Sequence, residues 1–130
     1  MIVVDTSVWI DHLRGSRRAA GLGERLDDGE VLVHPWVVGE LALGHLGPDP
    51  QTILGDLRTL PAAPTVAEDE VTLLIEARAL AGSGIGWVDA QLLASALTAG
   101  AGLWTSDRRL GDVAASLGLA SGGSPALRIR

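Results

Sequence analysis

The feature that most constrains the fold is the alternation of short apolar runs with longer segments of helical periodicity. Residues 2–4 and 31–33 are apolar without alternation and rich in β-branched side chains, which is typical of strands buried on both faces of a parallel sheet. The segments between such runs carry apolar side chains three or four residues apart, as helices that pack on a sheet do. We therefore expect a three-layer α/β/α fold around a central parallel sheet of four to five strands.

The same pattern predicts the individual elements. The expected strands are residues 2–4, 31–33, 63–66, 103–104 and 127–129. A first helix should follow the capping residues 5–7 and run to Leu13, and further helices are expected over 17–26, 36–46, 51–60, 68–81, 88–99 and 110–117. The chain has 130 residues, no internal repeat and no linker, so we expect a single domain over 1–130.

Several residue types are missing, and their absence excludes whole classes of chemistry. Without cysteine there are no disulfides, thiolate zinc sites or cysteine nucleophiles, and without lysine there is no Walker phosphate loop. The longest weakly polar stretch, residues 92–104, is too short to span a membrane, and no basic segment precedes the apolar residues 1–4. We expect a cytoplasmic protein without membrane contact. Its formal net charge of −6, taken alone, argues against a nucleic-acid partner.

Four acidic residues from four segments are expected to meet at one edge of the sheet. Asp5 directly follows the first strand, Asp107 follows the strand at 103–104, Glu40 lies in the helix after 31–33, and Asp89 lies in the first turn of its helix. Ligands of parallel α/β sheets bind outside the carboxyl ends of the strands. Helix capping would explain three of these acids one at a time, but Glu40 lies among apolar neighbours and should carry a desolvation penalty. Oxygen ligands alone favour Mg²⁺ or Mn²⁺ over zinc.

The three histidines show no metal-ligand spacing, and only His34, at the end of the second expected strand, should lie near these acids. The four tryptophans are scattered through the apolar pattern, so we expect them in the core or at an interface and not as platforms for nucleobases.

Four segments, in this order, together resemble a PIN domain and specifically the VapC toxin ribonucleases of bacterial VapBC toxin–antitoxin pairs: IVVDTSVWIDHLRG, VVGEL, WVDAQLLASAL and LWTSD. The resemblance covers essentially the whole chain. It implies that the metal-binding catalytic residues are Asp5, Glu40, Asp89 and Asp107. It also implies that Thr6, Ser7 or Thr105 orient them by hydrogen bonds. Some members carry another acid two residues after the last, where this chain has Arg109, and Asp112 would lie about 140° around a helix from Asp107. We therefore expect Asp112 at most to support the ligands by hydrogen bonds and not to bind the metal.

The resemblance further implies an endoribonuclease that uses Mg²⁺ or Mn²⁺ and cuts tRNA or rRNA, a cognate VapB antitoxin, and a homodimer. Removing the four proposed ligands from the count changes the formal charge from −6 to −2, so most of the acidity belongs to the site. Candidate RNA contacts are the arginines near the site, which equally suit ordinary surface ion pairs: Arg14, Arg17, Arg18, Arg108 and Arg109.

Two other readings remain open. A catalytically inactive PIN-like domain would act as a protein-interaction module, but it would be expected to have lost some of the four acids. An enzyme with a phosphoaspartyl intermediate would also place an Asp after the first strand, but it relies on a lysine, and one such class needs an acid where Ser7 stands.

Overall fold

A computed structural model describes residues 1–120 of the chain. Its sheet has three parallel strands in the order β2-β1-β3, formed by β1 (Ile2–Val4), β2 (Val31–Leu32) and β3 (Gly102–Trp104). The central strand pairs with both neighbours, so that Ile2 lies opposite Val31 on one side and Gly102 on the other. All three residues of β1 are fully buried, as its unbroken apolar run predicts.

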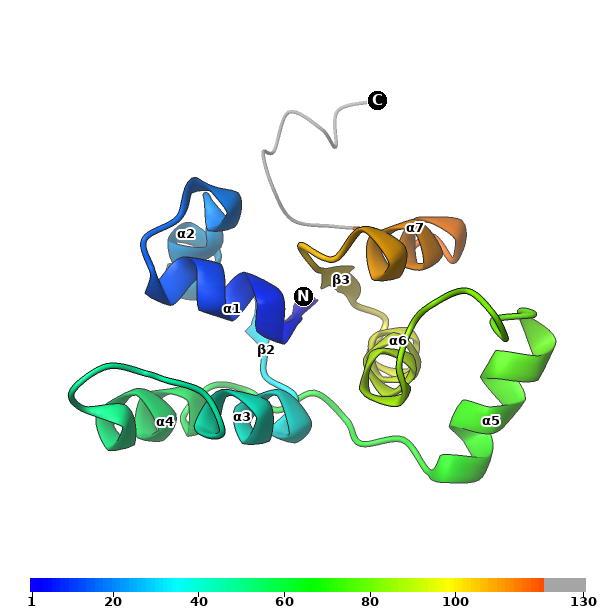
Figure 1. Cartoon of the computed structure of the whole chain (residues 1–130), viewed down its shortest axis with the longest axis horizontal. Coiled ribbons are helices and arrows are strands. Elements are labelled where there is room, and N and C mark those ends of the chain that lie inside the picture. Colours follow the sequence, from blue (N-terminus) through cyan, green and yellow to red (C-terminus); the bar gives the residue numbers. More distant parts are fainter. Residues whose placement is uncertain (121–130) are drawn as a thin grey trace.

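Helices cover both faces of this sheet. In Figure 1, α1 to α4 gather on one side of the strands and α5 to α7 on the other, which confirms the three-layer arrangement. The first group contains α1 (Thr6–Leu13), the 3₁₀ turn η1 (Arg17–Ala19), α2 (Leu22–Asp27), α3 (Pro35–Ala42) and α4 (Pro50–Arg58). The second contains α5 (Glu68–Ala77), α6 (Trp87–Ala99) and α7 (Arg108–Ser116).

The prediction of four to five strands is wrong for the part of the chain that the structure describes. Residues 63–66 form no strand; their region contributes one parallel bridge, between Ala62 and Val33. The reason lies in α6, where Gln91 accepts a hydrogen bond from the Val66 N–H at 2.8 Å and donates one to the Val66 carbonyl at 2.9 Å. Side chains thus satisfy the backbone groups that a neighbouring strand would have used.

The other end of the sheet also has only a bridge, between Leu103 and Ala120. The expected strand at 127–129 lies outside the described residues.

Several helices are shorter than expected. The segment 17–26 is divided at Gly21, whose φ of 93° lies in the left-handed region that favours glycine, so a 3₁₀ turn precedes α2. The helix expected over 36–46 ends at Ala42, and the one expected over 68–81 ends at Ala77. None of the helices in residues 1–120 is long and apolar enough to cross a membrane, and α6 has the greatest length, 13 residues.

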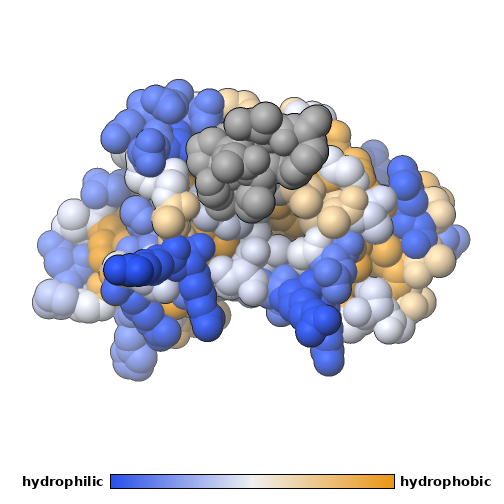
Figure 2. All heavy atoms as spheres, turned by 90° about the horizontal axis from the view of Figure 1, so that it is seen from above, coloured by the Kyte–Doolittle hydropathy of each residue, from blue (hydrophilic) through white to orange (hydrophobic). Residues whose placement is uncertain are grey.

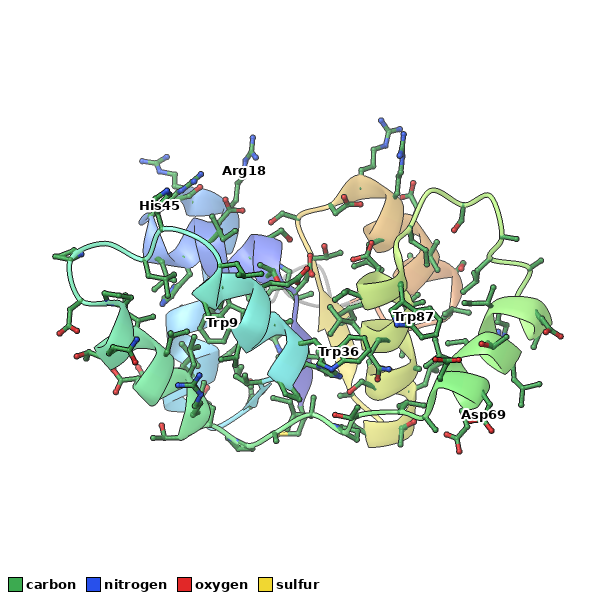
Figure 3. The ribbon with its side chains drawn as sticks, turned by 60° about the horizontal axis from the view of Figure 1, so that its bottom comes forward. Trp9, Arg18, Trp36, His45, Asp69 and Trp87 are labelled. Atoms are coloured by element: carbon green, nitrogen blue, oxygen red, sulfur yellow. The ribbon has the colours of Figure 1, made fainter. Side chains whose placement is uncertain are left out.

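The core lies mainly along β1 and α6. Helix α6 contacts β1 and β3 on one side and α5 on another, and all seven residues from Ala90 to Ala96 are buried. Two of the four tryptophans, Trp9 and Trp104, are buried in this core, whereas Trp36 and Trp87 are 36% and 42% exposed. Figure 3 shows Trp9 beneath α1 in the first helix group and Trp87 at the start of α6 in the second.

Candidate active site

Asp5 is the buried centre of the candidate site. It follows β1 directly, and only 6% of its surface is exposed. Although it occupies the N-cap position of α1, its side chain makes no capping hydrogen bond. Its Oδ2 instead accepts hydrogen bonds from the Ser7 hydroxyl at 2.7 Å and the Thr105 hydroxyl at 2.8 Å. The capping interpretation is therefore wrong for Asp5, whose carboxylate is held by two side chains from opposite ends of the sequence.

The two hydroxyls also fix the segment that follows β3. The Ser106 N–H donates to Ser7 Oγ, and the Asp107 N–H donates to Thr105 Oγ1, both at 3.0 Å. Each hydroxyl thus accepts from the backbone and donates to the same buried carboxylate. This network connects the beginning of α1 to the turn into α7, and it sets the position of Asp107 relative to Asp5.

Asp107 and Asp89 stabilise the beginnings of two helices. Asp107 Oδ1 accepts from the Leu110 N–H at 2.9 Å and caps α7, and its side chain is exposed. Asp89 lies in the first turn of α6, where its Oδ2 accepts from the Gly86 N–H at 2.9 Å. Each of these bonds occupies one carboxylate oxygen, so the second oxygen of each remains able to bind a ligand.

Glu40 comes from α3 and is held by the beginning of α1. The Thr6 hydroxyl donates to Glu40 Oε1 at 2.5 Å. The Glu40 side chain is exposed, so the expected desolvation penalty is wrong: the apolar neighbours Val37, Val38 and Leu41 turn to the core, and Glu40 lies on the outer side of the helix. Thr6, Ser7 and Thr105 each donate to one of the acids, as the resemblance implies.

The four carboxylates interact electrostatically. Burial raises the pKa of Asp89 above its usual value, and the nearby charges of Asp5, Asp107 and Glu40 raise it further, while the hydrogen bond from Gly86 opposes the increase. Among the side chains of residues 1–120, however, no three acids or histidines approach closely enough to form the ligand set of one ion. The site is a group of like charges in which three carboxylates act on Asp89, and its possible ligand atoms are all oxygens, which suits a hard divalent cation.

His34 supports the helix that carries Glu40. It is fully buried at the N-cap of α3, where its Nδ1 accepts from the Trp36 N–H at 3.0 Å. Its Nε2 has no hydrogen-bond partner among the described residues. Burial lowers the pKa of His34, and the neighbouring Gln91 side chain opposes this, although both polar atoms of Gln91 already bind Val66. A neutral, Nε2-protonated ring caps the helix.

The candidate arginines lie on both helix groups. Arg14 follows α1, Arg17 and Arg18 lie in η1, and Arg108 and Arg109 open α7; all five are exposed. In Figure 3, Arg18 extends from the upper edge of the ribbon into solvent. Figure 2 shows hydrophilic side chains on either side of a hollow along the lower edge of that view. The Arg109 side chain packs on Gly84, where an added Cβ would approach its Cδ to 2.7 Å.

Three supporting residues were not predicted from the sequence. Asp11 accepts a hydrogen bond from the Ser106 hydroxyl at 2.9 Å, which adds a third connection between α1 and the turn into α7. Gln91 and Ser95 are buried in α6 and bind the backbone of residues 64–66. The sequence carries a signal for them, because they are two polar side chains four residues apart within the apolar stretch 90–97. Asp112 is exposed and is not among the carboxylates that raise the pKa of Asp89.

Comparison with known proteins agrees with this architecture. Residues 2–116 match the family model of the PIN domain. Over 121 residues the chain is 49% identical to Ribonuclease VapC32 of Mycobacterium tuberculosis strain CDC 1551/Oshkosh, and equally to that of strain ATCC 25618/H37Rv. Each alignment covers 92% of this chain and 95% of the relative. With most of its length matched by the family and by these relatives, the chain belongs to the PIN domain family and, within it, to the VapC group.

Proposed function

We propose that this protein is a metal-dependent endoribonuclease and acts as the toxin of a toxin–antitoxin pair in the cytoplasm. The observation that carries the proposal is the convergence of Asp5, Glu40, Asp89 and Asp107, from four separate segments, around a buried carboxylate held by two hydroxyls. Capping accounts for single members of this set but not for their mutual repulsion, which a bound cation would offset. The 49% identity to a protein named a ribonuclease supports the same activity.

These four acids are the ligands that we propose for Mg²⁺ or Mn²⁺, and their side chains would have to turn toward one another to hold one ion, because no three of those in residues 1–120 lie close enough as they stand. When bound, such an ion lowers the pKa of a water molecule and offsets the charge that develops on phosphate oxygens. The protein's own contribution is positional. Ser7 and Thr105 keep Asp5 in one orientation, Thr6 holds one oxygen of Glu40, and the helix caps occupy only one oxygen each of Asp89 and Asp107. No side chain of the set needs to act as a covalent nucleophile.

RNA must approach this acidic site through positive charge. The exposed arginines on η1 and on α7 are our candidates for phosphate contacts. The 3₁₀ turn η1 follows α1, which carries Ser7, and α7 begins directly after Asp107. tRNA and rRNA loops are the proposed substrates, a VapB antitoxin the proposed inhibitor, and a homodimer the proposed assembly. An inactive interaction module is the alternative, and the intact set of acids argues against it.

The test is cleavage of labelled RNA with Mg²⁺ or Mn²⁺ present or chelated by EDTA. Wild-type protein should cleave only with the metal, and Asp5→Asn should lower the rate at least a hundredfold while keeping the fold by circular dichroism. Asp69→Asn is the matched control, since Asp69 is an exposed acid on α5 and lies at the far lower edge of Figure 3. Cleavage that persists in EDTA, or full activity of Asp5→Asn, would contradict the proposal, and a wild type that never cleaves RNA would favour the interaction module.

A further inference from the structure

A cavity of about 440 Å³ adjoins the acidic site on the side of α3. It lies between α1, α3, α4 and the loop that joins the last two helices, and its apolar walls come from Ile10, Leu41, Leu46 and Ile53. Its volume is within the range of about 300–1,000 Å³ that is typical of sites for small organic groups. Glu40 forms part of its lining, so the cavity and the candidate active site share one carboxylate.

The polar lining of the cavity is mixed in charge. Besides Glu40 it contains Arg14, at the end of α1, and His45, in the loop after α3; both side chains are exposed. In Figure 3, His45 lies at the upper edge of the molecule, on the same side as Arg18. A carboxylate accepts hydrogen bonds from the N–H groups of a nucleobase, whereas a guanidinium donates two parallel bonds to a phosphate. The apolar walls and the Glu40 carboxylate therefore suit a nucleobase, and the Arg14 guanidinium beside them suits the phosphate of the same nucleotide.

We propose that this cavity binds one unpaired nucleobase of the RNA, next to the phosphate that is cut, with Arg14 on the adjoining backbone phosphate. The inference rests on the proposed ribonuclease activity and names the feature of the substrate that the same site recognises. Sequence-specific recognition of RNA usually targets loops and ends, whose unstacked bases can be turned out into a protein pocket. An apolar protein segment would also cover these walls, but it would offer no phosphate to the Arg14 guanidinium that lies beside them.

Gly44→Leu tests the cavity by filling it. Gly44 lines the cavity, its backbone is outside the left-handed region, and an added Cβ would meet only the Leu41 carbonyl oxygen, at an ordinary 3.6 Å. Gly47 is less suitable, because its φ is +85°. The matched control is Gly55→Leu, since Gly55 lies in α4 outside the cavity and an added Cβ there meets nothing within 4 Å.

The assay uses 5′-labelled decaribonucleotides of A, C and U, each with and without one abasic position beside the cleaved bond, and bis(p-nitrophenyl) phosphate as a phosphodiester without a base. For the preferred base, we expect the abasic position to lower kcat/KM of the wild type at least tenfold. Gly44→Leu should lower kcat/KM on intact RNA as much, and the abasic position should cause no further loss in that variant. Hydrolysis of bis(p-nitrophenyl) phosphate should be unchanged in both glycine variants.

Two results would overturn the cavity assignment while leaving the ribonuclease intact. In the first, the loss of kcat/KM caused by Gly44→Leu and the loss caused by the abasic position multiply when the two are combined. In the second, Gly44→Leu cleaves RNA as fast as Gly55→Leu does, and the cavity would then be the binding site of a protein segment. If Gly44→Leu loses bis(p-nitrophenyl) phosphate hydrolysis too, Leu13→Trp replaces it, because Leu13 lines the same cavity and is 41% exposed. Absence of any metal-dependent RNA cleavage by the wild type would overturn the proposed function and this inference with it.

Discussion

Thr105→Val removes one hydroxyl from the network around Asp5 and keeps the size and β-branching of the side chain. The lost hydrogen bond, 2.8 Å from Thr105 Oγ1 to Asp5 Oδ2, ends on a buried carboxylate. A hydrogen bond to a charged group contributes about 1.5–3 kcal/mol, so we expect the free energy of unfolding to fall by about 2 kcal/mol. The Asp107 N–H also loses its acceptor, but Asp107 is exposed and water can replace the hydroxyl at small cost.

Urea unfolding at pH 7 in EDTA measures this loss without a metal contribution, and thermal unfolding should show a Tm lower by roughly 5–10 °C. The matched control is Thr72→Val, in which an exposed hydroxyl on α5 loses its bond to the Glu68 carbonyl. That surface change should remain within about 0.5 kcal/mol of the wild type.

A double-mutant cycle with Asp5→Ala shows whether the loss passes through the carboxylate. If the Thr105 hydroxyl acts mainly on Asp5, the two substitutions should be coupled by about 1–3 kcal/mol, because the second change removes a bond that the first has already lost. Additive effects of Thr105→Val and Asp5→Ala, or a Thr105→Val loss no larger than that of Thr72→Val, would refute the network as the support of this carboxylate.

Three further predictions concern groups around the site. Asp89→Asn should raise the free energy of unfolding at pH 7 by about 1 kcal/mol, because burial and the neighbouring acids disfavour the charge that the substitution removes, while the amide oxygen can still accept from Gly86. Since the pKa of Asp89 is raised in the folded protein, the contribution of Asp89 to stability is complete below about pH 3.8 and is lost as the pH rises through the folded value, so the difference in stability between wild type and Asp89→Asn in urea titrations should change over that range. The pKa of His34 is lowered, so its contribution is complete above its usual 6.5 and is lost as the pH falls through the folded value; His34→Asn, compared with wild type at pH 7.5 and 5, should lack that slope. Gln91→Leu should cost about 2–4 kcal/mol in chemical denaturation, because both backbone groups of Val66 lose their partner, and a loss below 1 kcal/mol would contradict that role.

The elements that the sequence predicted well are those whose signal is local. The run at β1 is buried on both faces and ends at Asp5, so its strand and the position of its acid both follow from adjacent residues. Helix α6 begins within one residue of its predicted start and ends where predicted. The strand expected over 63–66 failed because its partner is not a strand: Gln91, 25 residues further along, supplies the hydrogen bonds. Apolar periodicity does not encode that kind of long-range competition.

The sequence predicted which acids lie near one another better than it predicted their surroundings. Spacing placed four acids near strand ends and helix starts, and the electrostatic effect of three of them on Asp89 agrees with that grouping. The sequence spacing did not reveal that Glu40 turns outward. Val37, Val38 and Leu41 are its neighbours in the sequence, but they occupy the opposite side of α3. Nor did the spacing reveal the hydroxyl network, since Ser7 and Thr105 are 98 residues apart and meet only when β1 and β3 pair.

Capping a helix and binding a cation are compatible roles for Asp89 and Asp107 in this structure. Helices α6 and α7 begin beside the carboxylates, and the partial positive charge of a helix N-terminus stabilises a nearby anion by about 0.3–1 kcal/mol. The N-termini of α6 and α7 therefore offset part of the electrostatic repulsion among the four acids. Because each backbone N–H occupies only one carboxylate oxygen, the same side chain can cap a helix and face a cation. Substitution by Asn keeps an accepting oxygen and removes the charge, whereas Ala removes both, so comparing the two at each position separates the structural role from the proposed catalytic one.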